Sequence, residues 1–171
     1  MIKVNYDIKK YRESLLSVVS ENSTIIELGC HVGGTTKLFP ETSNIIAVDN
    51  SPEATAKMNK LKHVKFINGD VRLQNIIASV FEIVQKCDVL AIDLGGGYHP
   101  DTVFKVFYIW SSTFKPTHTI IRNRGILEFL NSSISDEEDY ISNEGFLDSY
   151  HDSGIPPQIK EFEIWMSSPK G

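Results

Sequence analysis

The sequence predicts an α/β protein with a doubly wound, mostly parallel sheet and helices on both faces. Two observations support this class. Short apolar runs of β type alternate along the chain with amphipathic helical stripes. Four acids also stand at the carboxyl ends of successive apolar runs, namely Glu27, Asp49, Asp70 and Asp93. Because crossovers between parallel strands are nearly always right-handed, such alternation places helices on both faces.

Composition predicts one domain over residues 1–171, with a helix within 1–22, a ligand-binding core over 23–125, and a helix and strands over 126–171. The net charge is −5 and the basic residues are scattered, so a nucleic-acid partner is not expected. Two cysteines predict no disulfide framework. We find no signal peptide and no apolar stretch long enough to span a membrane, which favours a cytoplasmic protein.

The first elements follow from apolar spacing. Residues 7–20 carry apolar side chains at helical intervals and should form a helix that precedes the first strand and packs near its ligand-binding end. Apolar runs at 24–28 and 45–48 predict strands, and the loop between them should enter a helix at Thr35-Thr36. Pro52 after Asn50-Ser51 predicts a short helix that extends to about Lys60.

The same alternation continues. A strand is expected over 64–71, and the following helix carries the best apolar stripe of the chain. Asp70 precedes that helix and is a candidate for its N-cap. A strand over 87–93 should lead through three glycines to a helix after Pro100, and a further strand is expected at 119–121. The inward positions of the helix after Pro100 are Val103, Phe104, Phe107 and Trp110.

The C-terminal part carries weaker signals. Residues 135–138 have the pattern of a capping box, which predicts a helix over 136–143 that stops at Gly145. Residues 159–167 alternate in polarity as a strand does.

The loop after the first predicted strand indicates a nucleoside ligand. Gly29, Gly33 and Gly34 tolerate positive φ and leave room for a ligand beside the backbone. The N–H groups that follow at Thr35 can meet a polar part of such a ligand. Asp49, at the tip of the neighbouring strand, is placed to accept both hydroxyls of a ribose.

The spacing within this loop distinguishes between nucleoside ligands. The dinucleotide fingerprint requires glycine at its first, third and sixth positions, and His31 occupies the third. The pattern Glu27-x-Gly29-x-x-x-Gly33 instead resembles motif I of the class I S-adenosylmethionine-dependent methyltransferases. Residues 64–71, 87–93 and 119–121 are similar to the third, fourth and fifth strands of that family.

The resemblance implies S-adenosylmethionine as cofactor and a seven-stranded sheet with an antiparallel C-terminal strand. Residues 159–167 would form that seventh strand and pair with a short sixth strand at 145–149. Glu27 would hold the cationic amino-acid end of the cofactor, and Asp70 would contact adenine, cap a helix, or do both. The cofactor-binding set is Glu27, Gly29, Cys30, His31, Gly33, Thr35, Asp49, Asn50, Asp70, Val71 and Asp93.

Methyl transfer is an in-line displacement, so the protein mainly aligns the reactants and, if needed, removes a proton. We expect Asp93 and the loop residues Tyr98 and His99 to lie at the methyl group, with His99 as the candidate base. Metal-dependent relatives resembling catechol O-methyltransferase carry a second acid where this chain has Arg122, so no metal is expected. Residues 122–124 would grip an acidic substrate or lie on a solvated loop.

The acceptor is expected to be a small molecule, and a homodimer is possible. Three alternatives stay open. The chain could be a non-catalytic S-adenosylmethionine-binding regulator or scaffold. It also resembles the fibrillarin-like RNA methyltransferases in a Gly-x-x-x-Gly-Thr-Thr stretch, although its acidic balance disfavours RNA. A nucleotide-dependent oxidoreductase would require NAD binding despite His31.

Overall fold

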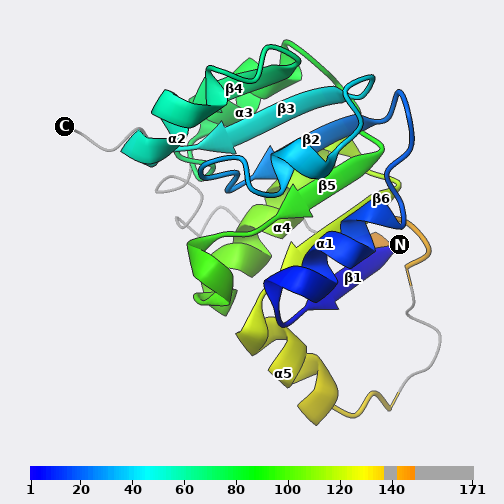
Figure 1. Ribbon diagram of the computed structural model, residues 1–171. Helices are drawn as coiled ribbons and strands as arrows, with labels where there is room; N and C mark the ends of the chain where they lie inside the picture. The colour runs from blue at the N-terminus through cyan, green and yellow to red at the C-terminus, as the bar shows by residue number, and fades with distance from the viewer. Residues whose placement is uncertain (137–141, 149–171) are drawn as a thin grey trace.

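The computed structural model describes residues 1–136 and 142–148. Its sheet has six strands, all parallel, in the order β1-β6-β5-β2-β3-β4 (Figure 1). This arrangement confirms the doubly wound α/β class. The strands are β1 (Ile2–Asn5), β2 (Thr24–Leu28), β3 (Asn44–Asp49), β4 (Val64–Asn68), β5 (Val89–Ile92) and β6 (His118–Arg122).

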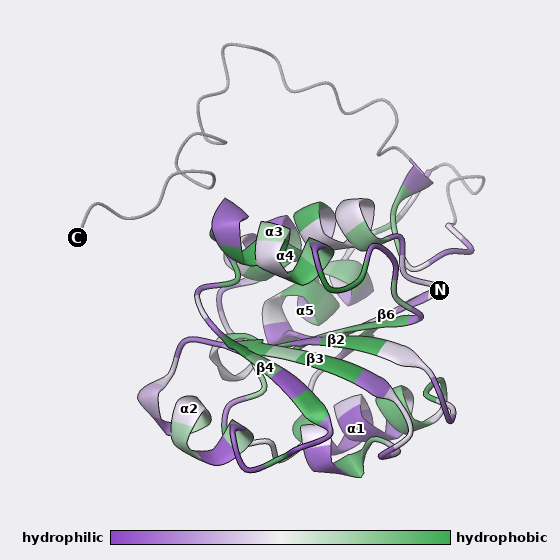
Figure 2. Cartoon of the chain, turned by 90° about the horizontal axis from the view of Figure 1, so that it is seen from above, coloured by the Kyte–Doolittle hydropathy of each residue, from purple (hydrophilic) through white to green (hydrophobic). Residues whose placement is uncertain are grey.

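Helices cover both faces of the sheet (Figure 2). Two helices, α1 (Ile8–Leu16) and α2 (Pro52–Met58), lie on one face, and three lie on the other: α3 (Gln74–Phe81), α4 (Pro100–Phe114) and α5 (Arg124–Ser132). Short 3₁₀ turns, η1 (Thr36–Leu38) and η2 (Gly95–Gly97), follow β2 and β5. No helix in the described ranges is both long and apolar enough to cross a membrane.

Period-two alternation divides the strand side chains between two cores. Ile26 and Leu28 of β2 face α3 and α4, where they join the largest cluster of buried apolar side chains, including Trp110 and Phe114. Ile25 faces α1, where it packs with Tyr11, Leu15 and Ile120. Glu27 continues the alternation and so points to the α1 side. Polar residues at the carboxyl ends of other strands lie on the same α1 side of the sheet. They are Asn5, Asp49, Asp93 and Arg122.

The sheet differs from the predicted one at its edge. Residues 2–5 form β1, which pairs in parallel with β6 and was not predicted, because polar Lys3 and Asn5 leave no continuous apolar run there. The described residues contain no antiparallel strand, and those at 145–148, expected in the sixth strand, are not a strand. In the described residues, β1 therefore forms the edge of the sheet beside β6. The predicted seventh strand at 159–167 lies outside the described residues.

Several other elements differ from the predicted ones in their bounds or exposure. The helix expected at Thr35-Thr36 is a single 3₁₀ turn, and the first helix ends at Leu16 rather than near residue 20. Phe104, expected inward, is half exposed. Helix α5 replaces the solvated loop considered at residues 122–124, because the Asn123 side chain caps it by accepting from the Ile126 N–H at 2.9 Å. Most of the helix expected over 136–143 falls outside the described residues.

Candidate functional site

The candidate site lies where the strand order reverses, between the carboxyl ends of β2 and β5. Open parallel sheets bind ligands in the crevice at such a point. Here the two loops meet closely: a Cβ built on Gly29 would lie 2.1 Å from the Asp93 carbonyl oxygen, and Gly29 has φ +86°. Only glycine fits this position, because a side chain would collide with the backbone of the β5 loop.

The glycine loop keeps a glycine-like conformation where the sequence departs from the dinucleotide fingerprint. His31 has φ +46°, between the positive φ of Gly29 and of Gly33 at +77°. A left-handed conformation is costly for a residue with a Cβ, so the surroundings must hold it. The His31 N–H donates to Asp49 Oδ2 at 2.8 Å, whereas its side chain is exposed. His31 thus enters the site through its backbone.

Asp49 joins the glycine loop to the next helix. Besides the His31 bond, its Oδ1 accepts from the Ser51 N–H at 2.7 Å. Both carboxylate oxygens are therefore oriented by the backbone, and each keeps a further lone pair for a hydroxyl group. The carboxylate is fixed before any ligand arrives.

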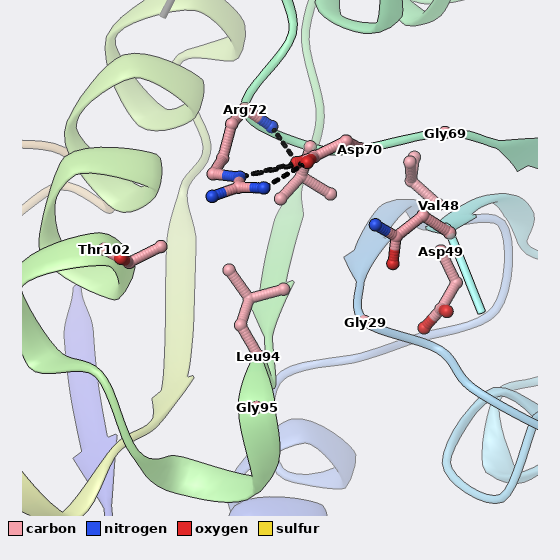
Figure 3. A pocket seen from close by; sticks show the side chains of 11 residues that line it. Gly29, Val48, Asp49, Gly69, Asp70, Arg72, Leu94, Gly95 and Thr102 are labelled. Atoms are coloured by element: carbon pink, nitrogen blue, oxygen red, sulfur yellow. Dashed lines mark hydrogen bonds and ion pairs between the residues drawn. The ribbon is translucent and has the colours of Figure 1, made fainter. Parts of the chain in front are cut away.

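A cavity of about 200 Å³ opens beside Asp49 (Figure 3). It joins the ends of four strands and the first turn of α4, and Trp110 of α4 holds the wall by donating to the Val71 carbonyl at 2.8 Å. The lining contains five members of the predicted cofactor set, Gly29, Asp49, Asn50, Asp70 and Val71, together with Val48, Gly69, Arg72, Leu94, Gly95 and Thr102.

Asp70 is engaged by Arg72 rather than by a helix. The Arg72 guanidinium donates to both carboxylate oxygens at 2.5 to 3.0 Å, and its N–H donates to Oδ1 at 2.9 Å. Hydrogen bonds from Arg72 lower the pKa of Asp70. Helix α3 begins later, with Leu73 at its N-cap, so the expected capping role of Asp70 is wrong. Arg72 was not singled out from the sequence, although its position two residues after Asp70 could have indicated this ion pair.

Glu27 is a buried acid with one neutral partner. Its side chain is 2% exposed, and its Oε2 accepts from the Thr36 hydroxyl at 2.6 Å. Burial raises the pKa of Glu27 from 4.5 to about 7, and the charges of Asp93 and Asp49 add to this, whereas the Thr36 bond and Arg12 oppose it. A cationic group is the partner that would best stabilise the charged form.

The raised pKa makes a prediction about stability. Between pH 4.5 and 7 the folded state holds a proton on Glu27 that the unfolded state releases, so stability should fall as pH rises through this window. The loss should be about 3 kcal/mol. In urea unfolding, Glu27→Gln should match the wild type near pH 4.5 and exceed it at pH 8. If the difference in free energy of unfolding between the two proteins stayed constant from pH 4.5 to 8, the raised pKa of Glu27 would be contradicted.

Asp93 forms an ion pair at the next strand end. Arg122 Nη1 lies 3.1 and 3.2 Å from its two oxygens, and each side chain is 16% exposed. Burial raises the pKa of Asp93, although the Arg122 charge acts against it. Arg122 thus neutralises the acid beside the β5 loop.

Tyr98 and His99 continue the β5 loop beyond the three glycines. The Tyr98 hydroxyl accepts from Arg124 Nη1 at 2.9 Å, and its carbonyl accepts from Asn123 Nδ2 at 2.8 Å. His99 is exposed, has φ +56° and stands at the N-cap of α4. Residues 122–124 therefore brace this loop instead of lying free in solvent.

The remaining predicted residues lie around the glycine loop. Cys30 is buried, and its burial raises the thiol pKa. Thr35 Oγ1 accepts from Arg12 Nε at 3.1 Å, which confirms that the first helix packs near this end of the sheet. Arg12 was missed, because it reads as a polar residue on an amphipathic helix. In the described ranges no group of three or more His, Cys, Asp or Glu residues is placed to hold a metal ion.

Comparison with known proteins identifies the fold. No model of a known protein family matches the chain, and no curated protein matches it significantly in sequence. An rRNA methylase from Streptococcus thermophilus superposes with TM-score 0.53 at 13% identity, over 82% of this chain and 92% of that one. A protein described provisionally as an rRNA methylase, from Clostridium thermocellum, gives 0.51 at 15%, over 78% and 83%.

A further similar structure is the N-methyltransferase NodS from Bradyrhizobium japonicum WM9, which contains S-adenosyl-L-homocysteine. It gives a TM-score of 0.47 at 16% identity, over 64% of this chain and 57% of that one. With the parallel sheet and its strand order, the two structures above 0.5 show that this chain has the class I S-adenosylmethionine-dependent methyltransferase fold.

Proposed function

We propose that the protein is an S-adenosylmethionine-dependent methyltransferase that acts on a small-molecule acceptor. The observation that carries this proposal is the preoriented Asp49 carboxylate beside a cavity at the crevice between β2 and β5. In this fold, that crevice is where a nucleoside-bearing ligand is expected.

The residues around the cavity suit the groups of this cofactor. Asp49 would accept the two ribose hydroxyls, since both of its oxygens are already oriented. Asn50, Val71 and Asp70 line the cavity on the β4 side and would surround the adenine. Because Gly29 has no side chain, only its backbone would border the cofactor where the loop approaches the β5 loop.

The Glu27 carboxylate would balance the positive charge of the ammonium group at the amino-acid end of the cofactor. It is buried, and among the described residues its hydrogen-bond partner is the neutral Thr36 hydroxyl, so a nearby cation would stabilise its charged form. Gly33, Cys30, His31 and Thr35 would shape this end through the backbone of the loop.

S-adenosylmethionine, when bound, supplies a methyl group on a positively charged sulfur. The chain's contribution would be to align the acceptor and to exclude water. Asp93, held by Arg122, would place a carboxylate beside the transfer region. His99 would take the proton that the acceptor loses, and Tyr98 would help to orient the acceptor.

One other function has specific support. The two similar structures reported above with TM-scores over 0.5 carry descriptions as rRNA methylases, which favours an RNA acceptor. Against it stand a net charge of −5 and the scattered lysines, since RNA binding draws most of its affinity from phosphate contacts.

Transfer of label separates these candidates. The protein is incubated with S-adenosylmethionine labelled on its methyl group and with a cell extract separated into small molecules, RNA and protein. We expect label in the small-molecule fraction, and none with Asp49→Ala. Label in RNA alone would support the RNA methyltransferase. Binding of S-adenosylhomocysteine without any transfer would support a non-catalytic regulator.

A further inference from the structure

Three loops at the carboxyl edge of the sheet converge on one arginine. Arg124, which follows β6, lies with its guanidinium carbon 4.9 Å from the ring centre of Tyr6 and 5.1 Å from that of Tyr98. Tyr6 follows β1, and Tyr98 lies near the end of the β5 loop. Because the strands are parallel, these loops lie at the same end of the sheet (Figure 1). The candidate cofactor cavity is lined by loops at that same end.

The two rings are held in place and yet remain open to solvent. Tyr6 is 51% exposed and Tyr98 is 57% exposed. Tyr98 is fixed at both ends: its hydroxyl accepts from Arg124, and its carbonyl accepts from Asn123, which is fully buried. A large aromatic surface that is both exposed and preoriented binds a flat partner at low entropic cost.

Arg124 differs from the other three arginines of the chain in the partners of its guanidinium. Arg72 and Arg122 are each paired with an acid, and Arg12 donates to Thr35 and acts electrostatically on Glu27 and Asp93. Within the described residues, no carboxylate pairs with Arg124, whose guanidinium contacts two aromatic rings and a phenol oxygen. Arg124 therefore leaves a positive charge uncompensated at this edge.

The position relates this cluster to methyl transfer. Leu94 and Gly95, at the start of the β5 loop, line the cofactor cavity, and Tyr98 stands at the other end of the same loop. A molecule that stacks on Tyr98 would thus lie on the loop that borders the cavity. Gly97 of this loop lies close to Arg122, since a Cβ on Gly97 would be 3.9 Å from Arg122 Nε. This is the region that an acceptor must occupy if the proposed function is right.

We propose that Tyr6, Tyr98 and Arg124 form the acceptor site, and that the acceptor is a small aromatic compound carrying an anionic group. The inference rests on the proposed function, since it assigns the acceptor of that same site. The tyrosine rings supply a stacking surface. Arg124 supplies a planar cation that can donate to an anion while it remains in contact with both rings. An RNA acceptor would need further cations along its phosphate backbone. Binding of the small aromatic anion should require no cation besides Arg124.

The test measures binding of three probes to protein loaded with S-adenosylhomocysteine, by calorimetry. The probes are 4-hydroxybenzoate, phenol, which lacks the anion, and cyclohexanecarboxylate, which lacks the aromatic ring. We expect 4-hydroxybenzoate to bind at least about fivefold more tightly than either of the others, since each lacks one of the two interactions.

Variants assign the effect to the cluster. Arg124→Gln should weaken 4-hydroxybenzoate about tenfold and leave phenol within about twofold, because only the charge is lost. Tyr98→Ala should weaken both aromatic probes, and Tyr98→Phe should retain most of the binding because the ring remains. Glu128→Gln, an exposed change on α5, is the matched control and should behave as the wild type. All variants should bind S-adenosylhomocysteine as the wild type does.

Equal affinity for 4-hydroxybenzoate and phenol, or an unchanged affinity in Arg124→Gln, would overturn the inference. So would a single-stranded RNA oligonucleotide that binds the loaded protein while none of the three probes does. Failure of the wild type to bind S-adenosylhomocysteine is a separate result: it defeats the proposed function, and it is read before any acceptor probe is added.

Discussion

Gly29→Ala should lower the free energy of unfolding by at least about 3 kcal/mol. Two costs add at this position. The backbone has φ +86°, which residues with a Cβ rarely adopt, and the new Cβ would lie 2.1 Å from the Asp93 carbonyl oxygen and 3.2 Å from the Leu94 side chain. Relief would require separating the loops after β2 and β5, where the strand order reverses. Urea unfolding measures the loss.

Gly96→Ala is the matched control. Gly96 also has positive φ, +67°, but a Cβ there would meet nothing within 4 Å. This variant isolates the conformational cost, which should be about 1 kcal/mol. Equal losses in the two variants would show that the close approach at Gly29 contributes nothing, and would contradict the geometry described for the crevice.

Asp49→Ala should weaken binding of S-adenosylhomocysteine at least about 100-fold. The carboxylate would accept two ribose hydroxyls, and it also holds the N–H groups of His31 and Ser51. Its removal therefore abolishes ligand contacts and frees the glycine loop. Calorimetry gives the affinity, and urea unfolding of the same samples gives the part of the effect that comes from the loop.

Two further variants control for charge and shape. Asp49→Asn keeps one oxygen acceptor and should lie between the wild type and Asp49→Ala. Asp101→Ala removes an exposed acid from the first turn of α4, close to the cavity, and should leave the affinity unchanged. If Asp49→Ala bound as tightly as the wild type, the assignment of the ribose to this strand end would be wrong.

Much of the central fold could be predicted because its strands are long apolar runs that end in polar residues. The five strands from β2 to β6 coincide with runs that alternate with helices, and the acids at their ends mark the binding edge. The edge strand could not be predicted. β1 has no continuous apolar run, and its place beside β6 depends on pairing with residues 119–122, more than a hundred positions away.

The candidate site was predicted in part, for a similar reason. Glycine and acid spacing are local, so Gly29, Asp49 and Asp70 could be read from the sequence. The partners of the acids are not local. Nothing near residue 93 shows that Arg122 will neutralise Asp93, and nothing near residue 98 shows that Arg124 will contact both Tyr98 and Tyr6. Such contacts arise when parallel strands bring distant loops to one edge.

Calorimetric titration of the wild-type protein with S-adenosylmethionine, and separately with NAD, tests the central claim most directly. The fold and the Asp49 site predict saturable binding of S-adenosylmethionine at one site per chain and no binding of NAD. No heat with S-adenosylmethionine, or tighter binding of NAD, would contradict the account.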